Sequence, residues 1–288
     1  MIISIASGKG GTGKTLIATS LAVALKDREK IQFLDCDVEE PDAHIFLKPE
    51  ITAGEDVLIP VPEVDKERCN YCGRCAEICA YNAIAVLENH ILIFQELCHG
   101  CGACGYLCPK EAISEKGRTA GNIEWGYSDS ISFTHGRLAI GEAMAPPIIR
   151  KVKERIDSDC IAIIDAPPGT SCPVVESVKG SDFCLLVTEP TPFGLNDLSL
   201  AVETVGELDI PCGVIINRDC GDNEEITGFC ENKGIPVMLT IPLDREIAYL
   251  YSKGITLTVG VPEWKPTFID LFGKIREIIN ERAGCIKR

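Results

Sequence analysis

The stretch Ile2-Ile-Ser-Ile-Ala-Ser-Gly-Lys-Gly-Gly-Thr-Gly-Lys-Thr15 decides the fold of this chain. Residues 2–5 are a β-branched run that predicts a buried strand, and residues 14–25 have the pattern of a helix. The loop between them matches G-x-x-x-x-G-K-[ST], in which glycines let backbone N–H groups close on phosphate oxygens at the positive end of the helix. We therefore expect a nucleoside triphosphate to be held by Gly8, Gly10, Gly11, Thr12, Gly13, Lys14 and Thr15.

The same loop also fits a second kind of nucleotide site. Gly8, Gly10 and Gly13 satisfy G-x-G-x-x-G, and Asp35 or Asp37 stands where a dinucleotide-binding fold places its ribose ligand. A dinucleotide site, however, does not require the lysine and threonine that end the loop, Lys14 and Thr15. These two residues favour a triphosphate, because the lysine would reach its β- and γ-phosphates while the threonine hydroxyl binds Mg²⁺.

A later segment supports the triphosphate. Residues 161–164 form an apolar run that ends in Asp165-Ala-Pro-Pro-Gly169. An acidic residue at the end of such a strand provides the second Mg²⁺ contact that phosphate transfer requires. Gly169 would then offer an unobstructed N–H to the γ-phosphate. The sequence therefore favours ATP with Mg²⁺ over a nicotinamide cofactor.

The composition narrows the class of protein. Lys and Arg total 28 against 43 Asp and Glu, a net charge of −15, so we expect no nucleic-acid partner and no binding to an anionic membrane. The sequence shows no basic and apolar leader and no apolar run of about 18 residues, which predicts a cytoplasmic protein. Its 16 cysteines should then stay reduced, and so many thiols suggest metal binding.

Short apolar runs rich in β-branched residues recur at residues 31–34, 161–164, 183–187, 214–216 and 237–239. Helical patterns at 14–25, 139–155 and 195–208 lie between several of them. This alternation predicts an α/β fold with a mainly parallel sheet and helices on both faces. Residues 266–282 have one apolar face and a polar face that is not strongly basic, so we expect this helix to pack on the sheet and not on a membrane.

Residues 63–118 interrupt the alternation. They contain two copies of C-x₂-C-x₂-C-x₃-C that start 29 residues apart: Cys69, Cys72, Cys75 and Cys79, then Cys98, Cys101, Cys104 and Cys108. We interpret the segment as a small domain inserted into a loop, since an insertion is well tolerated when its two ends lie close together. Residues 1–62 and 119–288 would then form one discontinuous domain.

The cysteine spacing is typical of iron–sulfur proteins. Three cysteines at this spacing can bind one [4Fe–4S] cluster while the fourth reaches the other cluster. The first cluster is therefore assigned to Cys69, Cys72, Cys75 and Cys108, and the second to Cys98, Cys101, Cys104 and Cys79. Two zinc sites are the alternative, although these commonly use C-x₂-C pairs split by a longer gap. The segment resembles bacterial two-cluster ferredoxins, which implies a small α+β domain; Ala80 stands where that family usually has proline.

Lys9, early in the phosphate loop, makes it resemble the deviant Walker A motif of the MinD/Mrp/ParA family, which includes the nitrogenase iron protein. Residues 33–37 resemble switch I of that family, residues 165–170 its Walker B motif and switch II, and residues 215–218 a strand end that recognises adenine. The resemblance extends over most of the chain outside the cysteine-rich segment. It implies a P-loop NTPase fold of the SIMIBI, MinD-like class.

The resemblance also implies an ATP-driven homodimer with ATP at its interface. Lys9 would reach the nucleotide of the other subunit, and Asp37 would position or activate the attacking water. Asp165 would hold Mg²⁺ through water, with a smaller contribution from Asp42. Asn217 would recognise adenine, the alternative being an ordinary residue at a strand end.

Cys172 lies on switch II, where the nitrogenase iron protein has a cysteine that ligates a cluster bridging its dimer. A bridging cluster normally needs a second cysteine in each subunit, and the sequence identifies none convincingly. A cysteine without a ligand role is therefore the favoured interpretation of Cys172, and the bridging role is the alternative.

Together the two units predict an ATPase that couples its dimer cycle to electron transfer, or to metallocofactor maturation, in a partner protein. Its cofactors would be ATP, Mg²⁺ and two [4Fe–4S] clusters. One alternative is an iron–sulfur cluster scaffold or carrier with slow ATP hydrolysis. Another is a MinD-like positioning ATPase whose clusters are structural or sensing.

Overall fold

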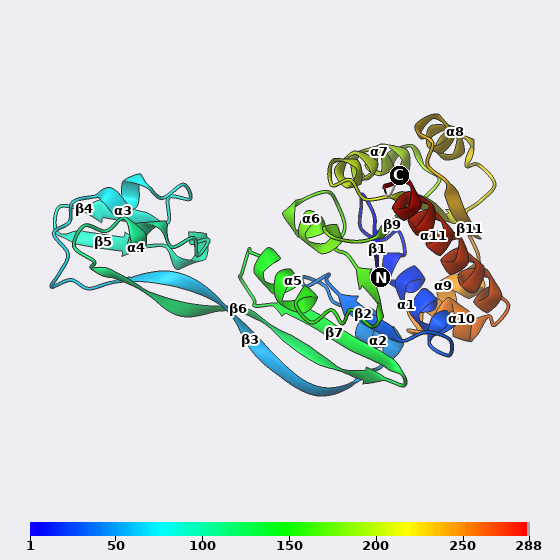
Figure 1. The fold of residues 1–288 in the computed structure, drawn as a ribbon, viewed down its shortest axis with the longest axis horizontal. Coiled ribbons are helices and arrows are strands. Elements are labelled where there is room, and N and C mark those ends of the chain that lie inside the picture. The colour runs from blue at the N-terminus through cyan, green and yellow to red at the C-terminus, as the bar shows by residue number, and fades with distance from the viewer. Residues whose placement is uncertain (287–288) are drawn as a thin grey trace.

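The computed structural model describes residues 1–286 and has two parts joined by a long two-stranded ribbon (Figure 1). One part is an α/β body and the other is a small unit of residues 65–112, here called the cysteine-rich module. The strands are β1 (Ile2–Ala6), β2 (Ile31–Asp35), β3 (Glu50–Val64), β4 (Ile84–Leu87), β5 (His90–Ile93), β6 (Ile113–Ser128), β7 (Ile131–Leu138), β8 (Ile161–Asp165), β9 (Phe183–Thr188), β10 (Cys212–Asp219) and β11 (Val237–Pro242). The helices are α1 (Lys14–Leu25), α2 (Ala43–Leu47), α3 (Arg74–Glu77), α4 (Ala103–Tyr106), α5 (Pro146–Lys153), α6 (Cys172–Val178), α7 (Pro192–Glu207), α8 (Glu224–Lys233), α9 (Arg245–Ser252), α10 (Leu257–Gly260), α11 (Trp264–Ile286) and the 3₁₀ turn η1 (Gln95–Leu97).

The body is built on one nine-stranded sheet in the order β11-β10-β9-β1-β8-β2-β7-β6-β3. Every pair from β11 to β7 is parallel, and only β6 and β3 run antiparallel to their neighbours. The mainly parallel α/β sheet predicted from the sequence is thus confirmed. Because the parallel strands end at one edge, β1, β2 and β8 bring their carboxyl ends together there.

Three strands of the nine-stranded sheet were not expected from the sequence, and one expected helix begins later than predicted. β3, β6 and β7 lack the continuous apolar runs that mark the other strands, and β3 exposes most of its residues. The helix predicted over 139–155 is wrong in its first part, because residues 139–145 form a loop and α5 begins only at Pro146. Two consecutive prolines fit the first turn of a helix, where no N–H is needed, but not its interior.

Helices cover both faces of the sheet. α1, α2, α10 and α11 pack on one face, whereas α5, α6, α7 and α8 pack on the other. Successive residues of one strand point to opposite faces of the sheet. Ile163 belongs to the core under α1, α2, α10 and α11, here called the first core, and Ile164 belongs to a core on the opposite face, under α5. α11 buries Phe268, Leu271 and Ile275 in the first core, so its apolar face is used within the body. No helix within residues 1–286 is long and apolar enough to cross a membrane.

β3 and β6 pair over their whole length, but β7 pairs with β6 only from Gly121 onwards. The remainder of β3 and β6 therefore leaves the body as the ribbon. On the ribbon Val57, Ile59 and Val61 are buried, as alternation along a strand requires. Pro60 in the same strand cannot donate a ladder hydrogen bond, which protects the free edge of β3 from further pairing.

The cysteine-rich module repeats its structure as well as its sequence. Each cysteine copy contains a one-turn helix, α3 or α4, preceded by a glycine in the left-handed region: Gly73 has φ 81° and Gly102 has φ 72°. Between the copies, β4 and β5 form a separate antiparallel hairpin. Glycine adopts positive φ without the steric cost of a Cβ, so both turns can form at the same place in each copy.

Ile148 of α5 is fully buried against two glycines of the sheet, and a Cβ at Gly121 or Gly136 would lie 2.6 Å from its side chain. We expect Ile148→Ala to lower the free energy of unfolding by about 2–5 kcal/mol through lost burial and a residual cavity. Ile140→Ala, on a fully exposed side chain, should change it by less than about 0.5 kcal/mol. Denaturant unfolding followed by circular dichroism checks both variants, and equal effects would contradict this packing.

Candidate functional site

The phosphate loop connects β1 to the first turn of α1. Gly11 and Gly13 have φ 77° and 93°, which glycine adopts readily. Gly8 packs against α7 so closely that a Cβ there would lie 2.1 Å from the carbonyl oxygen of Asp197. Lys14, the first residue of α1, is buried, with only 7 % of the residue exposed. The loop therefore holds a buried cation at the N-terminus of a helix, an arrangement suited to an anion.

Three acidic side chains surround this cation. Asp165 ends β8, Asp37 follows β2 and Asp42 precedes α2. Burial raises the pKa of all three carboxyls, to about 6 for Asp37 and about 7 for Asp165, while the Lys14 ammonium opposes the rise in each case. The Thr15 hydroxyl also opposes it at Asp42 and Asp165, so Thr15 lies beside both of them.

Several polar atoms of this site have no partner in the protein. Among residues 1–286, both carboxylate oxygens of Asp165, Oδ1 of Asp42 and the Thr12 hydroxyl are buried without a hydrogen bond. Leaving such groups unpaired is costly, most of all for a charged oxygen. A Mg²⁺ ion beside the carboxylates and a phosphate beside Thr12 would satisfy them. The residues present therefore fit a magnesium–nucleotide complex.

Asp35 has a structural role that rules out the ribose contact considered for it. It is fully buried beside its register partner Asp165 on β8. Its Oδ1 accepts the Asp37 N–H at 3.1 Å and its Oδ2 accepts the Ala43 N–H at 3.1 Å. Burial and the Asp165 charge hold its pKa well above the usual range. Asp35 thus fixes the start and end of residues 36–43, a segment that begins within the expected switch I and is called switch I from here on.

Lys9 is held within its own subunit. Its Nζ lies 3.0 Å from Oε2 of Glu189, and Nη1 of Arg218 lies 2.6 Å from Oε1 of the same carboxylate. Glu189 therefore bridges two cations from the phosphate loop and the end of β10. Any contact of Lys9 with another subunit would compete with this pair for its ammonium group. Sequence reasoning gave Glu189 no role, since its partners are distant in the chain.

Two expected ligands are engaged elsewhere. Asn217 donates from Nδ2 to the Thr12 carbonyl oxygen at 2.7 Å, bracing the phosphate loop. The Gly169 N–H donates to the Ser7 carbonyl oxygen at 2.9 Å and is not unobstructed as expected. A phosphate contact by Gly169 would require a change of hydrogen bond, whereas the Asn217 amide keeps a second N–H and a second oxygen lone pair for a base.

A pocket opens beside the phosphate loop, next to Gly13 and Leu16. Its walls combine apolar side chains of α1 and α9 with the polar groups of Asn217, Arg218 and Asp244. Such a mixture of apolar walls and a few polar groups is typical of sites for planar organic ligands. The cavity therefore suits the base of a nucleotide whose phosphates lie on the loop.

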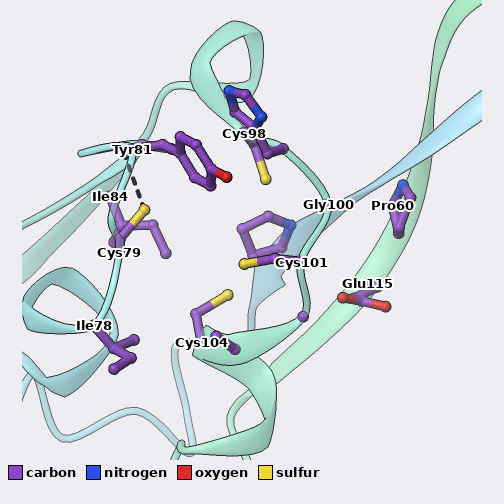
Figure 2. Close-up of a pocket in the computed structure, with 15 residues that line it drawn as sticks. Pro60, Ile78, Cys79, Tyr81, Ile84, Cys98, Gly100, Cys101, Cys104 and Glu115 are labelled. Carbon is purple, nitrogen blue, oxygen red and sulfur yellow. Dashed lines mark hydrogen bonds between the residues drawn. The ribbon is translucent and has the colours of Figure 1, made fainter. Parts of the chain in front are cut away.

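The eight motif cysteines line two further cavities, four in each. Figure 2 shows Cys79, Cys98, Cys101 and Cys104 with their sulfur atoms directed into the first of these. The second is lined by Cys69, Cys72, Cys75 and Cys108. The last cysteine of each copy thus joins the first three of the other copy.

Backbone N–H groups point at several of these sulfurs. Cys79 Sγ accepts from Ala83 and Cys108 Sγ from Ala112, both at 3.3 Å, and Cys69 Sγ accepts from Tyr71 at 3.4 Å. In residues 1–286 no group of three or more His, Cys, Asp or Glu side chains is placed to hold a metal ion. A cubane instead takes one thiolate on each of four irons, and four converging sulfurs with N–H donors fit that requirement.

Comparison with known proteins identifies the family. The sequence profile of the CobQ/CobB/MinD/ParA nucleotide-binding domain matches residues 3–257. The chain belongs to this family. Within it, the chain is 32 % identical to two uncharacterised proteins of Methanocaldococcus jannaschii, over 88 % and 97 % of its length and 90 % and 98 % of theirs.

Proteins of lower identity to this chain have assigned names. A protein of Pyrococcus abyssi called iron–sulfur cluster carrier protein is 24 % identical over 99 % of this chain and 89 % of its own. The cell division ATPase MinD of Pyrococcus furiosus superposes with a TM-score of 0.56 at 20 % identity, covering 96 % of this chain and 98 % of its own. MinD of Pyrococcus horikoshii with Mg-ADP gives 0.56 and 20 %, covering 96 % and 95 %. The body thus has the MinD-like P-loop NTPase fold.

The raised pKa of Asp165 predicts a pH dependence of stability. Its folded value of about 7 lies above the ordinary value of about 3.9, so the folded protein binds this proton more tightly than the unfolded chain. Stability is therefore lost as pH rises from about 4 to about 7. Asp165→Asn should reduce that loss in nucleotide-free, magnesium-free protein, measured as thermal unfolding between about pH 5 and 8. Asp270→Asn, on the exposed side of α11, should leave the slope unchanged; the same slope in both variants would contradict the prediction.

Proposed function

We propose that this protein is an ATP-hydrolysing iron–sulfur protein whose homodimer cycle is coupled to electron transfer, or to metallocofactor maturation, in a partner protein of the cytoplasm. The observation that carries the proposal is the place of the insertion. The cysteine-rich module, with two cavities of four cysteines each, stands in the chain between switch I and Asp165 of one nucleotide-binding body. Membership of a nucleotide-binding family supports the first half of the proposal.

In the proposed hydrolysis the phosphate loop holds the β- and γ-phosphates and Lys14 neutralises their charge. Thr15 and Asp165 would hold Mg²⁺, and both carboxylate oxygens of Asp165 are buried without a hydrogen bond among the described residues. Asp37 orients the attacking water, and its pKa of about 6 leaves it ionised and able to accept a proton at neutral pH.

Dimer formation would complete this site. Lys9 would leave Glu189 and reach the nucleotide of the second subunit. There its positive charge would stabilise the negative charge that develops during phosphoryl transfer. The base occupies the cavity beside the loop, where Asn217 and Asp244 offer hydrogen-bonding groups.

The cysteine sets would each hold one [4Fe–4S] cluster, which supplies one-electron transfer at low potential when bound. The protein's own contribution lies in the donors around the sulfurs. The N–H groups of Ala83, Ala112 and Tyr71 stabilise negative charge on their sulfur partners and so favour the reduced state.

A cluster carrier is the second candidate. Cys72 and Cys101, one in each cavity, are exposed, so both sites are open to an acceptor protein. The name of the Pyrococcus abyssi relative favours the same idea. A positioning ATPase of the MinD type has less support, because α11 already buries its apolar side chains within the body.

Cys108 tests the cysteine assignment. It belongs to the second copy by sequence but lines the cavity of Cys69. We expect Cys108→Ser to remove about half of the bound iron and to leave the same EPR spectrum as Cys69→Ser, because both would lose the same cluster. Cys98→Ser should leave the other spectrum, and Cys220→Ser, an exposed thiol outside the module, should change nothing. Matching spectra for Cys108→Ser and Cys98→Ser would refute the crossed assignment.

The variant Lys14→Ala tests whether the nucleotide site is coupled to the clusters. Lys14→Ala should abolish ATP hydrolysis and leave iron content intact, because the two sites share no residue. In the unaltered protein a non-hydrolysable ATP analogue should move the cluster midpoint by about 30 mV or more relative to ADP, measured by anaerobic EPR titration. That shift should be absent in Lys14→Ala. Without any shift in the unaltered protein, and with labelled iron passing to an apo-acceptor, the carrier function would replace the coupled one.

A further inference from the structure

Helix α5 lies beside α6, near the place where the ribbon leaves the body (Figure 1). It packs against α6, the helix that follows switch II, and also against β3, β6 and β7. At its C-terminal end, Lys153 Nζ donates to the carbonyl oxygens of Glu176, Ser177 and Lys179 at 2.7, 2.8 and 2.7 Å. One ammonium thus satisfies the exposed carbonyls at the end of α6, which ties the two helices together.

Switch I contacts the same region by a separate route. Val38 directly follows Asp37, and its carbonyl oxygen accepts the N–H of Leu138 at 2.8 Å. Leu138 is the last residue of β7, and the loop 139–145 that leads into α5 starts there. Val38 is therefore bonded to the residue that precedes loop 139–145, and Lys153 of α5 is bonded to the C-terminal end of the helix that follows switch II.

The loop of this unit is clamped to the ribbon by a buried ion pair. Glu142 Oε1 accepts the N–H groups of Ala143 and Met144, both at 3.0 Å, and its other oxygen pairs with Arg118 of β6. Only 2 % of the Glu142 side chain is exposed. Removing one partner of such a pair leaves a buried charge without compensation, so the pair holds loop and ribbon in one arrangement.

From the clamp an apolar path continues to the module. Arg118 is the register partner of Ile59. Ile59 belongs to one buried cluster that contains Val38 of switch I, Ile148 of α5 and, at its margin, Cys98. A Cβ at Gly100 would lie 3.0 Å from Ile59, so the loop carrying Cys98 and Cys101 rests directly on the ribbon.

We propose that loop 139–145 and α5 act as a lever that carries the nucleotide state to the cysteine-rich module, with the Glu142–Arg118 pair as its joint and Lys153 as its link to switch II. The proposal rests on the proposed function, because it needs switch segments that respond to the γ-phosphate. Packed interiors rearrange between discrete arrangements and do not deform continuously. A shift of α6 or Val38 therefore displaces α5 and the ribbon as one body, and the module at the end of the ribbon moves with them.

The test is hydrogen exchange read by mass spectrometry on the complete, cluster-loaded protein under anaerobic conditions, with Mg²⁺ and either ADP or a non-hydrolysable ATP analogue. In the unaltered protein, exchange should differ between the two nucleotides in the switch segments 36–43 and 166–171. It should also differ in β6 residues 113–120 and in the 98–104 loop. The β6 amides are the better reporters, because Pro60 and Pro62 in the facing strand carry no N–H.

Two positioning variants and one control separate the lever from simple stability. Glu142→Gln keeps the size of the side chain but breaks the ion pair with Arg118, and Lys153→Met removes the donors at the end of α6. Both should keep the nucleotide response of the switch segments and lose at least half of that in β6 and the 98–104 loop. Lys116→Gln breaks an exposed pair with Glu63 on the same ribbon and should keep both responses.

Three outcomes would overturn the lever. If β6 does not respond in the unaltered protein although the switches do, the lever is wrong and nucleotide binding stands. If both variants keep the full β6 response, the coupling does not pass through this joint. If the switch segments themselves do not respond, the proposed function fails and the lever fails with it.

Discussion

Two carboxyl groups side by side at the centre of the sheet constrain the rest of this structure. Asp35 and Asp165 are register partners on neighbouring strands, and both are buried. Two like charges in such a place cannot both ionise without compensation. Asp35 is satisfied by two backbone N–H groups of switch I, whereas Asp165 has the Lys14 ammonium nearby and two oxygens without a hydrogen bond in the described chain. Asp35 fixes the switch I loop, whereas Asp165 keeps its oxygens available for a ligand.

The ribbon follows from how the sheet ends on this side. β7 extends the parallel sheet and β6 turns back against it, so β6 and β3 can continue past the body without breaking the hydrogen bonds within it. A segment inserted at their far ends leaves the nucleotide site intact, because the two ends of the insertion stay paired. The same pairing makes the ribbon stiff enough to connect the module with α5.

Local patterns were the part of the structure that the sequence predicted well. The phosphate loop depends on glycines and a lysine within eight residues, and the parallel strands show as continuous apolar runs because both of their faces are buried. β3 could not be recognised in this way, since most of its residues are exposed. The Glu189–Lys9 and Glu142–Arg118 pairs were also missed, because each joins residues far apart in the chain and a lone charged residue carries no signal of its partner.

The sequence by itself determined the family, the phosphate loop and the eight cysteines in two registers, because each rests on short spacings that the backbone geometry fixes. Only the tertiary structure decided which groups are already engaged. Asn217 bonds to Thr12, Gly169 to Ser7 and Lys9 to Glu189. Three residues expected to contact a nucleotide therefore have partners within the chain. The position of the module relative to α5 was likewise decided only there. Such partners depend on which strands become neighbours, and that is set by burial of the whole sheet.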